Sequence, residues 1–217
     1  MFDFEHINLA QRVMMLIPML LSLAVHEWAH AWSAYRLGDD TAAMQGRLTL
    51  NPIAHIDPIG SFVLPLLLVP FGWAKPVPVN PTRFRRGVSM SAGMIITAAA
   101  GPLANVVLAV LSAAAFGSIA HFSPDVLTNP MGVGTLLKWL VSMNITLALF
   151  NMIPVPPLDG SRVVDGLIPY RWRPQWESIV RLSPLLFIAA WYFGGSIIAG
   201  PSNYVQGLLD RMVFAMS

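Results

Sequence analysis

Two histidines and a glutamate stand close together in the run His26-Glu27-Trp28-Ala29-His30. In a helix, residues four positions apart lie on the same face, so both imidazoles could reach one metal ion. The carboxylate beside them could serve as a general base that takes a proton from an attacking water. The run therefore predicts a zinc site with His26 and His30 as ligands and Glu27 as the base.

Two histidines can also share a helix face by chance. Here the run lies inside a long apolar stretch, where ionisable side chains are costly to bury and usually serve a function. The chain has no cysteine, so any metal ligand must be His, Asp or Glu. The apolar surroundings favour metal binding over a chance pairing.

A catalytic zinc needs three protein ligands and an open position, so a third ligand must come from elsewhere in the chain. Asp159 is the best placed, because it follows an apolar stretch expected to end on the same side of a membrane as His30. The alternative is a simple turn residue before Gly160, which is a common pairing. Other acids on that side are interpreted as loop or helix-cap residues: Asp39, Asp40 and Asp57.

The composition is that of a membrane protein. Apolar residues make up 55% of the 217 residues, charged residues only 11%, and the mean hydropathy is +0.61. A soluble domain carries roughly a quarter charged residues. The net charge of +2 does not indicate a nucleic-acid partner.

The first ten residues contain Asp3 and Glu5 and no basic residue, so we expect the first apolar stretch to remain as a membrane span rather than act as a cleaved signal peptide.

The apolar pattern predicts one all-α polytopic membrane domain over residues 1–217. A spanning helix needs about 20 apolar residues, and four stretches qualify: 9–37, 88–120, 134–153 and 182–198. Residues 59–73 are shorter and broken by prolines, which favours a re-entrant segment. We expect a short interfacial helix over 200–217. Residues 46–50 and 73–79 are expected to be extended and to form short membrane-associated β-strands beside the site.

Basic residues give the orientation of the spans. The loop 121–135 has none, whereas segments 38–87 and 156–181 carry several, which by the positive-inside tendency places those two segments in the cytoplasm. The site is then expected on the cytoplasmic side of a membrane, most simply a bacterial inner membrane. The basic residues concerned are Arg47, Lys75, Arg83, Arg85, Arg86, Arg162, Arg171, Arg173 and Arg181.

Several motifs, in this order, resemble the intramembrane site-2 protease family. They are His26-Glu27-x-x-His30, Asn51-Pro-x-x-His55-x-Asp57-Pro-x-Gly60, Gly72-Trp-Ala-Lys-Pro-Val-Pro-Val-Asn80-Pro81, Gly101-Pro-Leu-Ala-Asn105 and Asn151-x-x-Pro154-x-Pro156-x-Leu158-Asp159-Gly160. The chain would be a compact form of that family, without the PDZ or CBS domains that many relatives carry.

The resemblance implies one zinc ion bound by His26, His30 and Asp159, with Glu27 as the base. It implies substrates that are transmembrane segments, often of membrane-bound regulators, and favours Asn151 as a residue that binds the substrate or the developing oxyanion. The alternative for Asn151 is a helix–helix hydrogen bond.

Two further polar residues are assigned simpler roles. Asn105 follows a run of small residues and is interpreted mainly as a packing residue, with a role at the site as the less favoured alternative. His55 is expected to form hydrogen bonds in the re-entrant region, because a fourth protein ligand would close the open position of a catalytic zinc.

Two other functions remain as alternatives. One is a membrane zinc protease with a glutamate ligand, for which Glu177 is the only candidate. The other is a membrane-embedded metal transporter or a non-proteolytic chaperone. A transporter should carry polar residues at mid-membrane in several helices, whereas here they concentrate around one site. The sequence leaves the oligomeric state open.

Overall fold

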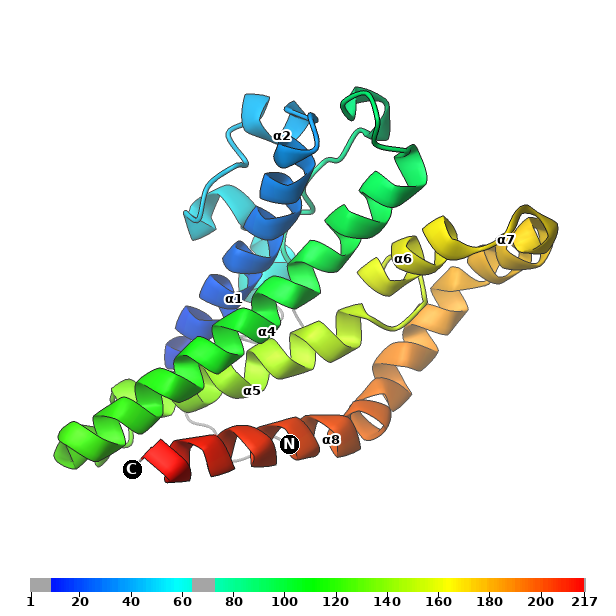
Figure 1. Ribbon diagram of the computed structural model, residues 1–217. Coiled ribbons are helices and arrows are strands. Elements are labelled where there is room, and N and C mark those ends of the chain that lie inside the picture. The colour runs from blue at the N-terminus through cyan, green and yellow to red at the C-terminus, as the bar shows by residue number, and fades with distance from the viewer. Residues whose placement is uncertain (1–8, 64–72, 217) are drawn as a thin grey trace.

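The structure is a computed structural model that describes residues 9–63 and 73–216 (Figure 1). The four long helices are α1 (Leu9–Arg36), α4 (Met90–Phe122), α5 (Val133–Asn151) and α8 (Ser183–Met216). The shorter α-helices are α2 (Thr41–Met44), α6 (Asp159–Leu167) and α7 (Arg173–Arg181). Single helical turns complete the described elements: η2 (Pro52–His55), η3 (Ile59–Val63), η4 (Pro81–Arg83), η5 (Pro124–Leu127) and η6 (Tyr170–Trp172).

Among the described residues, three helices are long and apolar enough to cross a membrane: Ala10–Arg36, Met90–Phe122 and Val133–Asn151. They coincide with three of the four predicted spans. The fourth predicted span, 182–198, qualifies only as part of a broken pair, Tyr170–Arg181 with Ser183–Ser196, whose two helices are bent by 69°. The expected interfacial helix over 200–217 is not separate, because α8 continues through Pro201. Figure 1 shows that α8 changes direction along its length.

The predicted β-strands were wrong, because the described residues form helices and irregular segments only. Residues 46–50 begin as the turn that ends α2, where Arg47 N–H donates to the Ala42 carbonyl at 2.8 Å. Residues 73–80 have no ladder partner among the residues that the structure describes. Pro76 and Pro78 lack an N–H, and other N–H groups of the segment bind elsewhere: Lys75 to the His55 carbonyl, Val77 to Glu27 and Asn80 to Asp39.

The predicted re-entrant segment falls largely on residues 64–72, which lie outside the described residues. Its first residues form the π-helical turn η3. Its last residue, Trp73, donates its backbone N–H to the Gly60 carbonyl at 3.3 Å.

Helix α4 lies at the centre of the fold and packs against α1, α5, α6 and α8 (Figure 1). Small side chains let helix backbones approach closely, which is how helices associate in an apolar solvent. Much of the buried face of α4 is made of such residues, namely Gly93, Ala98, Gly101, Ala109, Ala113 and Gly117. The close approach brings α1 side chains into direct contact with the α4 backbone.

A tight turn after α5 returns the chain to α1 and α4. Pro154, Pro156 and Pro157 follow the end of α5, where they cannot continue the helix. A Cβ at Gly160 would lie 2.3 Å from the Met152 carbonyl oxygen, so only glycine fits at this point of the turn. The turn places Asp159 at the first position of α6, facing the histidines of α1.

Candidate metal centre

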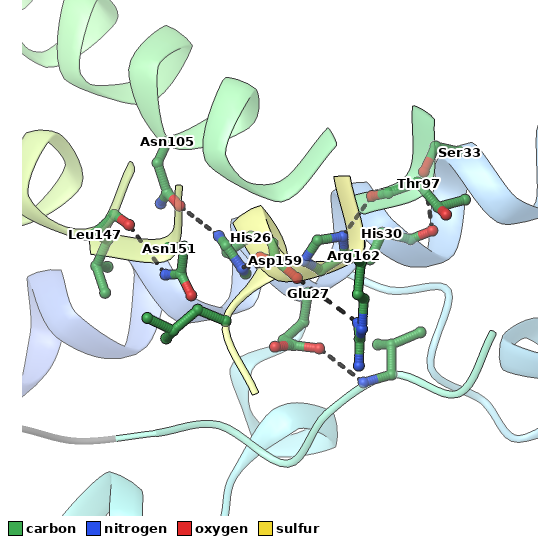
Figure 2. A network of polar contacts seen from close by, with 12 residues as sticks. His26, Glu27, His30, Ser33, Thr97, Asn105, Leu147, Asn151, Asp159 and Arg162 are labelled. Carbon is green, nitrogen blue, oxygen red and sulfur yellow. Dashed lines mark hydrogen bonds and ion pairs between the residues drawn. The ribbon is translucent and has the colours of Figure 1, made fainter. Parts of the chain in front are cut away.

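The structure brings His26, His30 and Asp159 together, two from α1 and one from the start of α6 (Figure 2). Their ligand atoms all lie within 4.8 Å of one another. Asp159 Oδ2 is 3.1 Å from His26 Nε2 and 3.2 Å from His30 Nε2, and the two Nε2 atoms are 3.0 Å apart. All three side chains are buried.

Hydrogen bonds on the far side of each ring orient the imidazoles. His26 Nδ1 lies 2.6 Å from Asn105 Oδ1, and His30 Nδ1 lies 2.6 Å from the Thr97 carbonyl oxygen. Both partners are acceptors, so each Nδ1 carries the proton and each Nε2 presents a lone pair. Three electron-pair donors therefore converge on one point, an arrangement that a cation stabilises.

The donor set fits zinc. Two imidazole nitrogens and one carboxylate oxygen form a ligand set typical of a catalytic zinc, with a fourth position open for a reactant. Burial works against a charge on Asp159, but its contacts with the two imidazoles favour the carboxylate and hold its pKa well below the usual value. Asp159 is thus a charged oxygen donor at neutral pH.

Gly101 lets α4 close one side of the cluster. A Cβ at this position would lie 2.4 Å from His30 Nε2 and 2.7 Å from His26 Cε1. Any larger residue would push the imidazoles away from their shared point.

A buried polar network connects His26 of α1 to α4 and α5. Asn105 donates to the Ser22 carbonyl oxygen at 3.2 Å and to Asn144 Oδ1 at 2.6 Å, and Asn144 donates to Ser22 Oγ at 2.8 Å. Ser22, Asn105 and Asn144 are all 0% exposed. Asn105 thus does more than pack between helices, as was mainly expected, because it also holds His26. The sequence analysis did not single out Ser22 and Asn144. Both could have been recognised as polar residues inside apolar spans.

Glu27 is buried beside the cluster and faces a different segment of the chain. Its Oε2 accepts a hydrogen bond from the Val77 N–H at 2.8 Å. Figure 2 shows the carboxylate directed towards that backbone rather than towards Asn105. Its predicted role as the base stays a prediction.

Asn151 lies at the last position of α5 and is half-buried. Its amide donates to the Leu147 carbonyl at 3.0 Å, within its own helix (Figure 2). A second amide hydrogen is left for another acceptor, so the predicted substrate-binding role remains a prediction. His55 is buried, and its Nε2 lies 2.8 Å from the Thr49 carbonyl oxygen, as expected for a hydrogen-bonding role.

Arg162 links the cluster to the surface. Its guanidinium lies 3.6 Å from Asp159 Oδ1, the oxygen that does not face the histidines. The Arg162 side chain is 43% exposed, against 7% for Asp159. The buried centre therefore has a polar neighbour that reaches solvent.

Comparisons with known protein families and sequences find several relatives of this chain. The model of peptidase family M50 matches residues 117–190, which include Asp159 but not the histidine run. The chain is 39% identical to YwhC of Bacillus subtilis over 156 residues, which is 71% of this chain and 69% of that protein. It is 31% identical to Rip2 of Mycobacterium tuberculosis over 192 residues, which is 84% of this chain and 71% of that protein.

Both relatives are named only as candidate zinc metalloproteases. No solved structure matches the chain significantly. Both relatives are more than 30% identical to this chain, and the match covers more than two thirds of each of them. The chain therefore belongs to peptidase family M50, the site-2 protease family of zinc metalloproteases that its motifs indicated.

Proposed function

We propose that this chain is an intramembrane zinc endopeptidase that hydrolyses peptide bonds within or near the transmembrane segments of other membrane proteins. The depth of the metal centre carries the proposal. His30 and His26 lie in the span Ala10–Arg36, about 9 and 15 Å from its C-terminal end at 1.5 Å per residue. If this 27-residue span, about 40 Å long, is centred in a hydrocarbon layer about 30 Å thick, both histidines lie inside that layer.

The active site faces the cytoplasmic side of what is most simply a bacterial inner membrane. The C-terminal end of α1, the N-terminal end of α4 and helices α6 and α7 lie towards the same end of the bundle (Figure 1). Segments at this end hold the basic clusters, and basic residues are retained on the cytoplasmic side. The connection between α4 and α5, at the other end, has no basic residue from 123 to 132.

Each residue of the metal centre has its own role in the proposed hydrolysis. A bound zinc ion would supply Lewis acidity, which polarises the scissile carbonyl and makes water a stronger acid. His26, His30 and Asp159 would hold that ion, in the orientation set by their hydrogen bonds. Glu27 would accept the proton of the attacking water and pass it to the leaving amine. Asn151 would donate its second amide hydrogen to the substrate.

Substrates enter from the lipid, while water reaches the site from the cytoplasm beside Arg162. A substrate helix hides its peptide carbonyls in hydrogen bonds, so it must unwind before it can be cut. We therefore expect faster cleavage of segments with Gly, Asn or Pro near the scissile bond, since these residues weaken a helix. Such selectivity suits regulated intramembrane proteolysis of membrane-bound regulators.

The test is to map the cut. The purified protein is placed in liposomes with a single-span substrate, and the products are identified by mass spectrometry. A Gly-Asn pair in the substrate span is compared with Leu-Leu at the same positions. A cut within the span, faster for Gly-Asn, supports the proposal. Cleavage confined to the soluble tails, or at equal rates, would overturn it.

A further inference from the structure

Two buried charged residues outside the metal centre bind one stretch of backbone. Asp39 is 0% exposed and Arg47 is 6% exposed. Burying a charge is costly unless strong hydrogen bonds compensate. Asp39 Oδ2 accepts the Asn80 N–H at 2.6 Å, and the Arg47 guanidinium donates to the Lys75 carbonyl oxygen. Both charges therefore act on residues 73–80, here named the strap.

The strap is held at several points along its length. Ser61 Oγ donates to the Trp73 carbonyl at 2.9 Å, and the Lys75 N–H donates to the His55 carbonyl at 2.9 Å. The Val77 side chain is buried against Ala31 of α1 and Ala42 of α2. Pro76 and Pro78 fix the backbone on both sides of Val77, because their φ angles are locked. Fixing Lys75 and Asn80 therefore also fixes the direction of the Val77 N–H.

The Val77 N–H binds the Glu27 carboxylate. It donates to Oε2 at 2.8 Å, in a buried environment. A general base works only when its carboxylate sits within hydrogen-bond reach of the proton it takes, and a free Glu side chain samples many rotamers. Holding one carboxylate oxygen orients the other.

We propose that Asp39 and Arg47 are positioning residues, which clamp the strap so that the Val77 N–H holds the Glu27 carboxylate in its working orientation. The inference rests on the proposed function of Glu27 as the base. Asp39 contributes twice, because its Oδ1 also accepts the Thr41 N–H at 3.0 Å and so ties the strap to α2. Neither Asp39 nor Arg47 touches the substrate in this account.

The sequence Pro76-Val77-Pro78-Val79 supplies a matched pair for the test. Both valines follow a proline, and Val77 is the one whose N–H binds Glu27. Replacing valine by its α-hydroxy analogue turns the N–H into an ester oxygen and leaves the side chain intact. The ester at 77 removes the contact to Glu27, while the ester at 79 controls for the chemistry.

Both ester proteins are compared with the unmodified protein in liposomes for bound zinc, kcat and KM. We expect the ester at 77 to lower kcat by up to about 100-fold, the loss that a misplacement of about 1 Å can cause, with zinc and KM unchanged. The ester at 79 should behave as the unmodified protein. Equal kcat for the two esters would overturn the inference.

The clamp itself is tested by Arg47→Met, with Arg47→Lys as the conservative variant that keeps a donor. Arg171→Met, at an exposed position, is the matched control. We expect Arg47→Met to lower kcat at constant zinc, Arg47→Lys to recover part of it and Arg171→Met to change nothing. Because Arg47 acts through Val77, Arg47→Met should add little to the loss in the ester-77 protein. Full additivity of the two losses would refute the coupling.

Glu27→Gln separates this inference from the function on which it rests. If Glu27→Gln still cleaves, the proposed function itself fails. If Glu27→Gln is inactive and the ester at 77 is fully active, only the strap inference fails.

Discussion

Gly101 and His30 touch so closely that a Cβ at position 101 would lie 2.4 Å from His30 Nε2. The α4 backbone thus serves as one wall of the metal centre, and the width of a glycine sets the distance between α4 and α1. The same contact explains why a span that needs only apolar character carries a glycine here.

Gly101→Ala is expected to expel zinc. The new methyl would displace both imidazoles, and measured zinc per chain and cleavage should fall together. Gly200→Ala is the control, because a Cβ there has nothing within 4 Å and alanine favours a helix over glycine by about 1 kcal/mol. Full zinc occupancy in Gly101→Ala would show that the helices separate at little cost.

Asn144→Leu is expected to weaken zinc binding without touching a ligand. It removes the acceptor of Asn105, which in turn holds His26. Loss of such an outer partner typically costs about 10- to 100-fold in metal affinity. Competition with a chelator measures the affinity, and Asn203→Leu, at an exposed site of α8, is the control. A lower melting temperature with unchanged zinc affinity would show that the hydrogen bonds between Asn105 and Asn144 stabilise the helix packing and do not support the metal centre.

Asn151→Ala is expected to separate binding of metal from binding of substrate. The side chain makes its hydrogen bond within α5, to Leu147, so zinc should remain bound. If Asn151 donates to the substrate or the oxyanion, cleavage should fall by about 100-fold or more. Zinc content and initial rates are measured on the same liposomes. Cleavage at the wild-type rate would show that Asn151 binds neither the substrate nor the oxyanion.

Removal of the metal should be reversible. A strong chelator is expected to abolish cleavage, and added zinc should restore it, because the ligand rings remain oriented by Asn105 and the Thr97 carbonyl. Circular dichroism before and after chelation checks that the helices persist. Activity that survives complete loss of zinc would exclude a metalloprotease.

Much of the site could be predicted from the sequence, because its signals are local. The spacing of His26 and His30 fixes their shared helix face, and the apolar pattern placed the first span at 9–37, against Leu9–Arg36 in the structure. Asp159 was found by its position after the third span. Its place beside the histidines agrees with that reasoning, although its role as a ligand remains a prediction.

The errors came from interactions between distant residues. Residues 73–79 were predicted to form a strand because their prolines exclude a helix, but the Val77 N–H binds Glu27, which lies 50 residues away in the sequence. The N–H of Asn80, which follows this segment, binds Asp39, which lies 41 residues away. Asn105 and Asn144 become partners only when α4 and α5 pack. Propensity and periodicity describe neighbours along the chain and do not report such pairs.

The proposed mechanism requires that Glu27 takes the proton at a zinc ion held by His26, His30 and Asp159. We would therefore measure bound zinc and cleavage of a single-span substrate for wild type and Glu27→Gln in the same liposomes. Glu177→Gln, at an exposed position, is the matched control. We expect one zinc per chain in all three proteins and cleavage by wild type and Glu177→Gln alone. Cleavage by Glu27→Gln at the wild-type rate, or cleavage by a wild-type protein that holds no zinc, would contradict the proposed mechanism.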